Sequence, residues 1–306
     1  MPNRLLLRLA RSPAVRRFVT SASLTRPVVE RFVAGETVED GIEAARRLAT
    51  GRIASVLDYL GEHAAGESQA NAATDLYLKC LTRIKTEGLD THISVKLTQL
   101  GLDQSFEQAL RRMGEICGAA AGGPSGPATM VAIDMESHRY TDRTIEVYRR
   151  LADRHENVIL CLQAYLKRTE GDLASLLASR PSIRLVKGAY DEPDDLAFGS
   201  RDTDASFRRL LALLLDVSSY AAVATHADGL IQETLRLARQ RGLPPERFEF
   251  QMLYGVRRDL QRVLRGAGHR VRVYIPFGDQ WYPYLMRRMA ERPRNLRLFA
   301  EALFRG

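Results

Sequence analysis

A short segment near the C-terminus, Tyr284–Glu291, gathers side chains that could bind a small acid. It contains no Gly, Pro or β-branched residue, so we expect it to be helical. Residues spaced i, i+3, i+4 and i+7 share one face of a helix, and here they are Tyr284, Arg287, Arg288 and Glu291. Two adjacent guanidinium groups repel each other unless an anion lies between them, and each offers a donor fork that matches a carboxylate. The face is a candidate carboxylate site, although a solvated basic surface is the simpler interpretation of these residues alone.

The composition of the chain excludes several classes of protein. With 306 residues, 45% hydrophobic and 27% charged, it can bury one large core or two small ones, which argues against disorder. Its three cysteines, Cys80, Cys117 and Cys161, are far apart and form no CxxC pair. Neither a zinc site nor a disulfide network is expected, and a reducing cytoplasm is the simplest compartment.

The net charge of +8 favours anionic partners such as a phosphate-bearing cofactor, nucleic acid or an anionic membrane surface. The arginines are scattered through predicted helices and form no compact basic block interleaved with aromatic residues. A basic, non-enzymatic barrel that binds nucleic acid is therefore a secondary hypothesis. The sequence holds no apolar run of about 18 residues, so no membrane-spanning segment is expected.

The first 26 residues are rich in arginine and leucine, and no acidic residue precedes Glu30. Such a segment is typical of a mitochondrial transit peptide. It is also typical of a basic amphipathic segment that lies on a membrane or on the protein's own surface. The sequence leaves both interpretations open, so the expected location is the cytoplasm, with peripheral contact to the inner face of the cell membrane, or the mitochondrion if the segment is a transit peptide.

The elements that must position the arginine face alternate regularly. The predicted strands, most of them almost continuously apolar, cover residues 52–59, 92–97, 129–135, 158–164, 182–188, 221–226, 248–253 and 270–276. The predicted helices cover residues 67–87, 104–121, 143–155, 170–179, 205–219, 228–241, 256–267 and 279–290.

Eight strand–helix pairs predict an α/β fold, a (β/α)8 barrel of the TIM type. The competing doubly wound sheet normally has fewer strands, and its G-x-G-x-x-G phosphate loop is missing here. We divide the chain into residues 1–50, a basic segment with a helical arm, and residues 51–306, the barrel.

Polar or ionisable residues occur at nearly every predicted strand end, which is where such barrels carry their chemistry. They are Asp58 with Glu62, Lys96, Asp134, Gln163, Arg184, the run Lys187–Tyr190, Thr225 with His226, Gln251, and Tyr274. Because buried polar groups are costly unless paired, this pattern indicates an enzyme site. It contains several cations but no Ser/His pair, metal triad or reactive cysteine, which favours an organic cofactor. The turn at Gly188 and the start of the helix after His226 could contact a pyrophosphate.

Seven ordered motifs then resemble one family. They are ISVKLTQLG (93–101), IDMES (133–137), LQAYL (162–166), RLVKGAYDEP (184–193), ATHAD (224–228), FEFQMLYG (248–255) and YLMRRMAERPRN (284–295). The set resembles the FAD-dependent proline dehydrogenases, most closely the single-function bacterial enzymes, and the resemblance covers about residues 30–295. The resemblance implies a distorted (β/α)8 barrel whose final helix carries the arginine pair over the barrel mouth.

The same resemblance implies an activity. L-proline would be oxidised to 1-pyrroline-5-carboxylate by hydride transfer from C5 to FAD, and the electrons would pass to a membrane quinone. A flavin dehydrogenase for hydroxyproline or another cyclic imino acid would share this site. No aldehyde dehydrogenase or DNA-binding domain is recognisable, so the product is expected to be released and the chain is not expected to act as a repressor. No metal is expected in the site.

The resemblance also implies roles for individual residues. Those expected to bind the substrate are Lys96, Tyr190, Leu253, Tyr274, Tyr284, Arg287 and Arg288. Those expected to bind FAD are Met135, Gln163, Arg184, Val186, Lys187, Gly188, Ala189, Thr225, His226, Gln251 and Glu291. Asp134 and Arg184 are the expected catalytic residues, with Arg184 at the reacting flavin nitrogen and Asp134 supporting Lys96. For Lys96 the structural alternative to substrate binding is an ion pair with Asp134. Many family members have Asn directly after the glutamate of the arginine motif, whereas Arg292 stands there in this chain.

Overall fold

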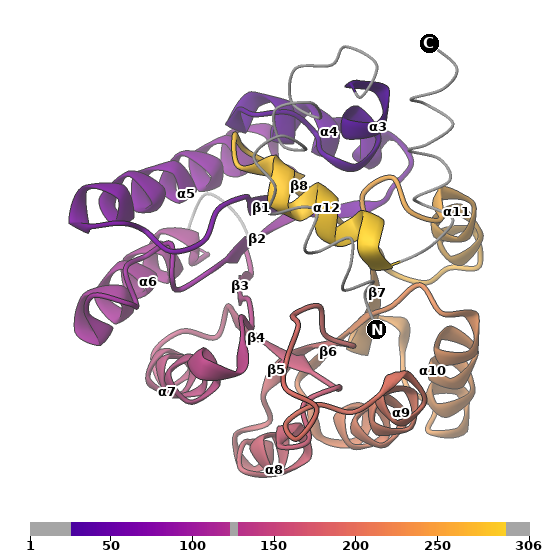
Figure 1. Ribbon diagram of the computed structural model, residues 1–306. Coiled ribbons are helices and arrows are strands. Elements are labelled where there is room, and N and C mark those ends of the chain that lie inside the picture. Colours follow the sequence, from indigo (N-terminus) through magenta and orange to yellow (C-terminus); the bar gives the residue numbers. More distant parts are fainter. Residues whose placement is uncertain (1–25, 123–127, 292–306) are drawn as a thin grey trace.

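A closed barrel of eight parallel strands forms the centre of the molecule. The computed structural model describes residues 26–122 and 128–291, except for the side chains of residues 26–28, 287 and 289–291 (Figure 1). The strands pair in chain order and are β1 (Ala54–Tyr59), β2 (Thr91–Val95), β3 (Val131–Ile133), β4 (Val158–Gln163), β5 (Ser182–Val186), β6 (Tyr220–Ala224), β7 (Phe248–Leu253) and β8 (Val271–Phe277). The predicted eight-stranded barrel is confirmed.

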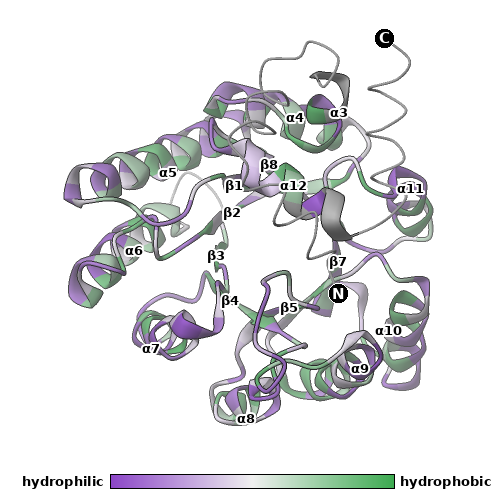
Figure 2. Cartoon of the chain, viewed as in Figure 1, coloured by the Kyte–Doolittle hydropathy of each residue, from purple (hydrophilic) through white to green (hydrophobic). Residues whose placement is uncertain are grey.

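Helices surround the barrel. They are α3 (Arg26–Phe32), α4 (Val38–Thr50), α5 (Glu67–Glu87), α6 (Phe106–Ala120), α7 (Thr141–Ala152), α8 (Thr169–Ala174), α9 (Ser200–Val217), α10 (Asp228–Gln240), α11 (Arg258–Gly266) and α12 (Trp281–Glu291). The outer helices carry both hydrophobic and hydrophilic residues (Figure 2). In α10, for example, Leu230, Thr234 and Leu237 are buried at helical spacing. No helix in the described ranges is long and apolar enough to cross a membrane.

Several predicted boundaries differ from the observed ones. The strand predicted at residues 129–135 is only Val131–Ile133, so Asp134 and Met135 lie just beyond its end. The strand predicted at 182–188 stops at Val186, because Gly188 adopts a backbone φ of +120° that no strand residue has. The helix predicted at 170–179 divides into α8 and a 3₁₀ turn at Leu177–Ser179. The two shortened strands leave Asp134 and Lys187 in loops at the same end of the barrel.

The barrel is distorted because its last helix does not cover its last strand. Figure 1 shows α12 crossing over one end of the barrel instead of lying along β8. The helix α4, which precedes the first strand, packs against β1 and β8. Gly41 allows this close packing, since a Cβ atom there would lie 3.2 Å from side-chain atoms of Leu57 and Phe277. Residues 38–50 of the predicted N-terminal arm therefore cover β1 and β8.

The first described helix holds α12 in place. Phe32 of α3 packs with Tyr282, Leu285 and Met286 of α12 in a separate apolar cluster. The indole Nε1 of Trp281 also donates a hydrogen bond of 3.1 Å to Glu36. The site end of the barrel is thus covered by two helices that lie near opposite ends of the sequence.

A glycine in the loop after β7 permits the approach of α3. Gly255 has a φ of +73°, and a Cβ atom at this position would lie 1.8 Å from the carbonyl oxygen of Arg31. Any larger residue would have to displace α3 and would also be strained.

We therefore predict that Gly255→Ala lowers the free energy of unfolding by about 2 kcal/mol. Gly266→Ala is the matched control, because a Cβ there meets nothing within 4 Å and alanine favours the helix. Chemical unfolding of both variants measures the difference. Equal stability of the two variants would contradict the packing role of Gly255.

Candidate active site

A cavity of about 460 Å³ lies at the C-terminal ends of the strands. Every strand, or the residue just after it, contributes to the lining, and α12 contributes Tyr284 and Arg288. The predicted site residues that line this one cavity are Lys96, Asp134, Met135, Gln163, Arg184, Val186, Lys187, Gly188, Ala189, Tyr190, Thr225, His226, Gln251, Leu253, Tyr274, Tyr284 and Arg288. The side chains of Arg287 and Glu291 lie outside the described residues. The structure brings the others together, while their individual roles stay predictions.

The register of the strands explains why long polar side chains fit in the interior. Arg184 of β5 has Cys161 of β4 and Ala222 of β6 as its neighbours. Both neighbours are small, so they leave room for an arginine side chain across the barrel. The register therefore gives Arg184 space to reach groups on other strands.

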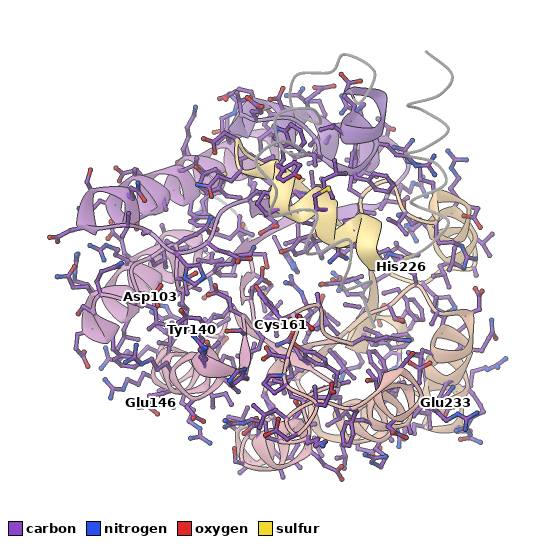
Figure 3. All side chains as sticks on the ribbon, viewed as in Figure 1. Asp103, Tyr140, Glu146, Cys161, His226 and Glu233 are labelled. Carbon is purple, nitrogen blue, oxygen red and sulfur yellow. The ribbon has the colours of Figure 1, made fainter. Side chains whose placement is uncertain are left out.

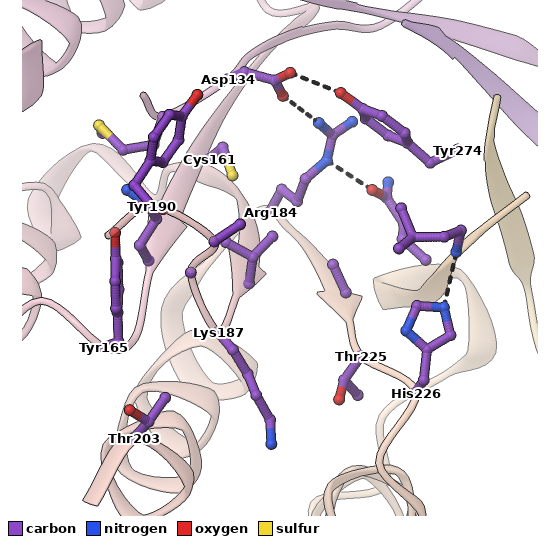
Figure 4. A pocket seen from close by; sticks show the side chains of 18 of the residues that line it. Asp134, Cys161, Tyr165, Arg184, Lys187, Tyr190, Thr203, Thr225, His226 and Tyr274 are labelled. Atoms are coloured by element: carbon purple, nitrogen blue, oxygen red, sulfur yellow. Dashed lines mark hydrogen bonds and ion pairs between the residues drawn. The ribbon is translucent and has the colours of Figure 1, made fainter. Parts of the chain in front are cut away.

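Asp134 accepts hydrogen bonds from four side chains, and Figure 4 shows those from Arg184 and Tyr274. Ser94 and Arg184 donate to Oδ1 at 2.6 and 2.8 Å, whereas Tyr274 and Lys96 donate to Oδ2 at 2.7 and 3.2 Å. Burial acts to raise the pKa of Asp134, but Lys96 and Arg184 outweigh it, so the pKa falls below its ordinary value. Asp134 is therefore a carboxylate at neutral pH.

Lys96 lies between two carboxyl groups. Its ammonium Nζ is 2.5 Å from Asp58 and 3.2 Å from Asp134. Burial acts against its charge, yet Asp58, Tyr274 and Asp134 raise the pKa of Lys96 well above its ordinary value. Burial also raises the pKa of Asp58 to about 6, and Asp134 adds to this effect. The ion pair expected between Lys96 and Asp134 is present, but Asp58 is the nearer partner.

Arg184 is held by hydrogen bonds on two of its three nitrogens. Its Nε donates to Gln251 at 2.7 Å, and its Nη1 donates to Ser94 at 2.7 Å as well as to Asp134. The third nitrogen, Nη2, is buried and has no hydrogen-bond partner among the described residues. The guanidinium carbon lies 5.3 Å from the ring centroid of Tyr274. One donor nitrogen of a rigidly held cation is thus left for a ligand in the cavity.

The rim of the cavity combines α12 with two loops. The guanidinium carbon of Arg288 lies 5.3 Å from the ring centroid of Tyr284, one turn earlier on α12. Across the rim, the hydroxyl of Tyr190 donates to Glu62 at 3.2 Å. These contacts place aromatic rings and a guanidinium fork above the charged residues at the bottom of the cavity. We call these residues, Asp58, Lys96, Asp134 and Arg184 with their partner Ser94, the floor of the site.

The other side of the cavity is formed by the loops after β5 and β6. At Gly188 a Cβ atom would lie 2.1 Å from the ring of Tyr165, so only glycine allows the turn to pass this ring. The imidazole Nε2 of His226 accepts the backbone N–H of Leu253 at 2.9 Å (Figure 4). Lys187 forms an ion pair with Asp204 of α9. His226 is therefore fixed in place just before the N-terminus of α10.

A second polar cluster lies outside the cavity. Asp103 accepts hydrogen bonds from Tyr140 at 2.7 Å and from His63 at 2.8 Å. Figure 3 shows Asp103 and Tyr140 away from the barrel centre, whereas Cys161 lies near it. This cluster connects three loops and does not line the cavity. In the described ranges, no group of three or more His, Cys, Asp or Glu side chains could hold a metal ion.

Sequence reasoning gave no role to several residues of the floor. Asp58 was noted at a strand end without a function, and Ser94 was not singled out. Ser94 lies two residues before Lys96, so the alternation of side chains along a strand was a usable signal for it. Glu249 bonds Gln251 from two residues earlier in β7, and the same alternation could have found it.

Comparisons with known proteins agree with this geometry. The family model described as Proline dehydrogenase matches residues 41–298. The chain is 40% identical over 272 residues to Proline dehydrogenase 1 of Bacillus subtilis subsp. natto, covering 89% of each chain. It is 39% identical over 287 residues to Proline dehydrogenase of Deinococcus radiodurans, covering 91% of each chain.

Solved structures show the same fold. The proline utilization A (PutA) protein of Bdellovibrio bacteriovorus, inactivated by N-propargylglycine, superposes with a TM-score of 0.78 at 22% identity. The match covers 87% of this chain and 32% of that one, so this chain spans about a third of that larger protein. The extent of the family match and the identity to full-length relatives show that this chain belongs to the proline dehydrogenase family, whose enzymes oxidise proline.

Proposed function

We propose that this chain oxidises L-proline at C5 with a bound FAD and passes the electrons to a membrane quinone. The observation that carries the proposal is the buried Arg184, whose Nη2 has no hydrogen-bond partner within the described part of the chain and lies in a cavity ringed by aromatic and cationic side chains. A hydrogen-bond donor held in this way suits an acceptor atom of a ligand that gains negative charge during reaction.

The cavity residues fit a flavin dinucleotide. Near Gly188 the chain turns with a φ that only glycine adopts easily, and without a Cβ atom there a phosphate can approach the backbone amides closely. Thr225 and His226 precede α10, whose N-terminus favours phosphate oxygens. We assign FAD binding to these residues together with the remaining predicted set, Met135, Gln163, Val186, Lys187, Ala189 and Gln251.

The substrate carboxylate is assigned to the arginine face of α12. The floor holds two carboxylates, Asp58 and Asp134, and two cations, Lys96 and Arg184, so its formal charges cancel. Binding an additional anion needs a further cation, and Arg288 lines the cavity from above. Its planar fork can take both oxygens of a carboxylate. Arg287 is assigned the same role from its place on the helix.

FAD, when bound, accepts the hydride that leaves C5 of proline. The chain's own residues then act mainly by positioning and by excluding water. Tyr190, Leu253 and Tyr274 enclose the pyrrolidine ring, while Lys96 and Arg288 orient the carboxylate. Arg184 stabilises the charge that arrives at the cofactor, and the amine proton leaves to water.

The electron acceptor and the location are further parts of the proposal. We assign the electrons to a quinone of the inner face of the cell membrane. Residues 1–25, which lie outside the described residues, carry the arginines that would contact its anionic lipids.

The first prediction concerns the flavin. The purified chain supplied with FAD is expected to be yellow, to bleach when L-proline is added without oxygen, and to recover its colour when vesicles containing anionic lipid and a quinone are added. Absorbance of the bound flavin measures each step.

Two controls separate the parts of this prediction. Vesicles without quinone should not restore the colour, and deletion of residues 1–25 should slow the recovery without affecting the bleaching. A chain that takes up no FAD, or whose flavin stays yellow with proline, contradicts the proposed reaction. Equal recovery with and without residues 1–25 contradicts the membrane contact alone.

The second prediction tests the carboxylate clamp. Arg288→Lys replaces a planar fork by a point charge and should weaken proline binding by about tenfold while flavin binding is kept. Titration of flavin bleaching with proline gives the affinity. Arg262→Lys on the exposed face of α11 is the matched control and should behave like the parent chain. An unchanged proline affinity in Arg288→Lys would reject the clamp.

The third prediction follows from the pKa of Asp58, which is raised to about 6. Above this pH Asp58 is an anion that neutralises Lys96, and below it Asp58 is neutral. The affinity for tetrahydrofuran-2-carboxylate, the oxygen analogue of proline without a titrating amine, should therefore rise by roughly threefold or more as the pH falls through this value.

Asp58→Asn provides the control for this pH dependence. Its side chain is neutral at every pH, so the affinity for the analogue should lose the step near pH 6. The free energy of unfolding depends on pH in the same direction as this affinity. Because the pKa of Asp58 is raised in the folded state, its carboxyl group favours the folded state at low pH, and this contribution is lost as the pH rises through the folded pKa. The same step in both proteins would show that Asp58 is not its origin.

A further inference from the structure

A second buried ion pair lies deeper in the barrel, below the residues assigned to substrate and cofactor. Glu249 of β7 and Arg272 of β8 both have fully buried side chains, and the arginine Nε lies 2.8 Å from Glu249 Oε1. Neither residue lines the cavity. The proposed reaction gives this pair no task.

The pair is connected to the site through one amide. The same Oε1 atom of Glu249 accepts a hydrogen bond of 2.8 Å from Nε2 of Gln251. The other end of the Gln251 amide, Oε1, accepts the Nε–H of Arg184 at 2.7 Å. A continuous series of hydrogen bonds thus runs from Arg272 through Glu249 and Gln251 to Arg184.

The orientation of the Gln251 amide decides whether this series can exist. An amide has a donor end and an acceptor end, and turning it round would place N–H groups against Arg184. A carboxylate only accepts hydrogen bonds and a guanidinium only donates them, so Glu249 and Arg184 both favour the orientation that presents the amide oxygen to Arg184, and Glu249 holds the donor end of the amide. The charge of Glu249 is in turn held in the interior by Arg272, since an isolated buried carboxylate would be costly.

Arg272 is itself anchored at the opposite end of the barrel. Its Nη1 donates to the backbone oxygens of Ser55 and Asp90 at 2.9 and 3.2 Å, and its Nη2 donates to the carboxylate of Asp90 at 3.0 Å. The guanidinium is therefore fixed by groups from β1 and from the segment before β2. This anchoring gives Glu249 a defined position.

We propose that Glu249 and Arg272 are positioning residues for the reaction, acting through Gln251 to hold the Arg184 guanidinium so that its Nη2 serves the flavin. The inference deepens the proposed function and rests on it, because it takes Arg184 to lie at the cofactor. The pair touches neither substrate nor cofactor. Its effect is on the orientation of a cation whose remaining nitrogens are occupied by Gln251, Ser94 and Asp134.

The test replaces the pair without leaving a buried charge. In the double variant E249M/R272M two apolar side chains of similar length occupy the same space, a change that buried ion pairs often tolerate. We expect this variant to fold and to bind FAD. The rate of flavin reduction by proline in a single turnover should fall about tenfold or more, while the proline affinity changes by less than about threefold.

The reduction potential of the bound flavin is the readout that a merely structural pair would not move. It should become more negative, because a misplaced Arg184 stabilises the reduced, negatively charged cofactor less well. Gln251→Met should produce similar changes. When Gln251→Met is already present, E249M/R272M should cause little further loss, since the pair acts through Gln251 and residues that act through one another are not additive.

Arg112→Met is the matched control for removing a buried arginine elsewhere. Arg112 lies in α6, bonds Asn71 and the carbonyl of Leu100, and does not line the cavity. In the Arg112→Met variant, the reduction potential of the flavin and the rate of its reduction by proline should equal those of the parent chain. A shift of the same size in this variant would show that general loosening of the fold explains the result, and would overturn the proposal.

The remaining outcomes also decide the matter. A parent-like rate and potential in E249M/R272M, or losses that multiply with that of Gln251→Met, would overturn the positioning role. If the double variant does not fold, Glu249→Gln gives the answer, because its amide no longer selects one orientation of Gln251; an unchanged potential there overturns the proposal. Failure of the parent chain to bleach with proline would instead reject the proposed function itself.

Discussion

The carboxylate of Asp134 is the group on which the arrangement of the site depends. It accepts hydrogen bonds from Ser94, Lys96, Arg184 and Tyr274, which come from the β2, β5 and β8 sides of the barrel. Ser94 and Lys96 lie on or just after the strand next to β3, whereas the bonds from Arg184 and Tyr274 cross the interior and form only when the barrel is closed. A buried carboxylate that lost such partners would be destabilising by roughly 3–5 kcal/mol. The floor of the site therefore acts as one unit, in which each ion fixes the charge and position of the others.

The distortion of the barrel follows from how the upper half of the site is built. A regular barrel would use the helix after β8 to cover the outside of that strand. Here α12 carries Tyr284 and Arg288 to the cavity, and α4 packs against β1 and β8 in its place. The contact between α3 and α12 then sets where the arginine face lies. Because the segment after β8 crosses the site instead of lying along β8, α12 can carry the proposed carboxylate clamp and α4 covers the last strand.

Much of this could be predicted from the sequence. The strands are short, nearly continuous apolar runs separated by longer amphipathic ones, and this alternation depends on local residues alone. The polar residues at strand ends were visible for the same reason, and all of them with a described side chain and an assigned role lie around one cavity. The family resemblance placed the arginine face over the barrel mouth, which periodicity could not do.

What the sequence could not supply are the pairings between distant residues. Asp58 is nearer to Lys96 than Asp134 is, and the difference depends on the register of β1 and β2. Glycine is needed at position 255 because a Cβ atom there would lie 1.8 Å from the carbonyl oxygen of Arg31 in α3, more than 200 residues earlier in the chain. The alternation along β7 places Glu249 on the same face as Gln251, but its ion pair with Arg272 of β8 is a contact between strands that alternation does not reveal.

The contact between α3 and α12 has a consequence for the order in which the protein matures. Synthesis yields α3 and the loops after β5 and β6 before α12, although β8 ends shortly ahead of it, so the loops assigned to the cofactor exist before the arginine face. Phe32 and Val33, which pack against α12, are synthesised early in the chain. The protein would then gain its capacity to bind a dinucleotide first. It would gain its selectivity for an imino acid only when α12 is made.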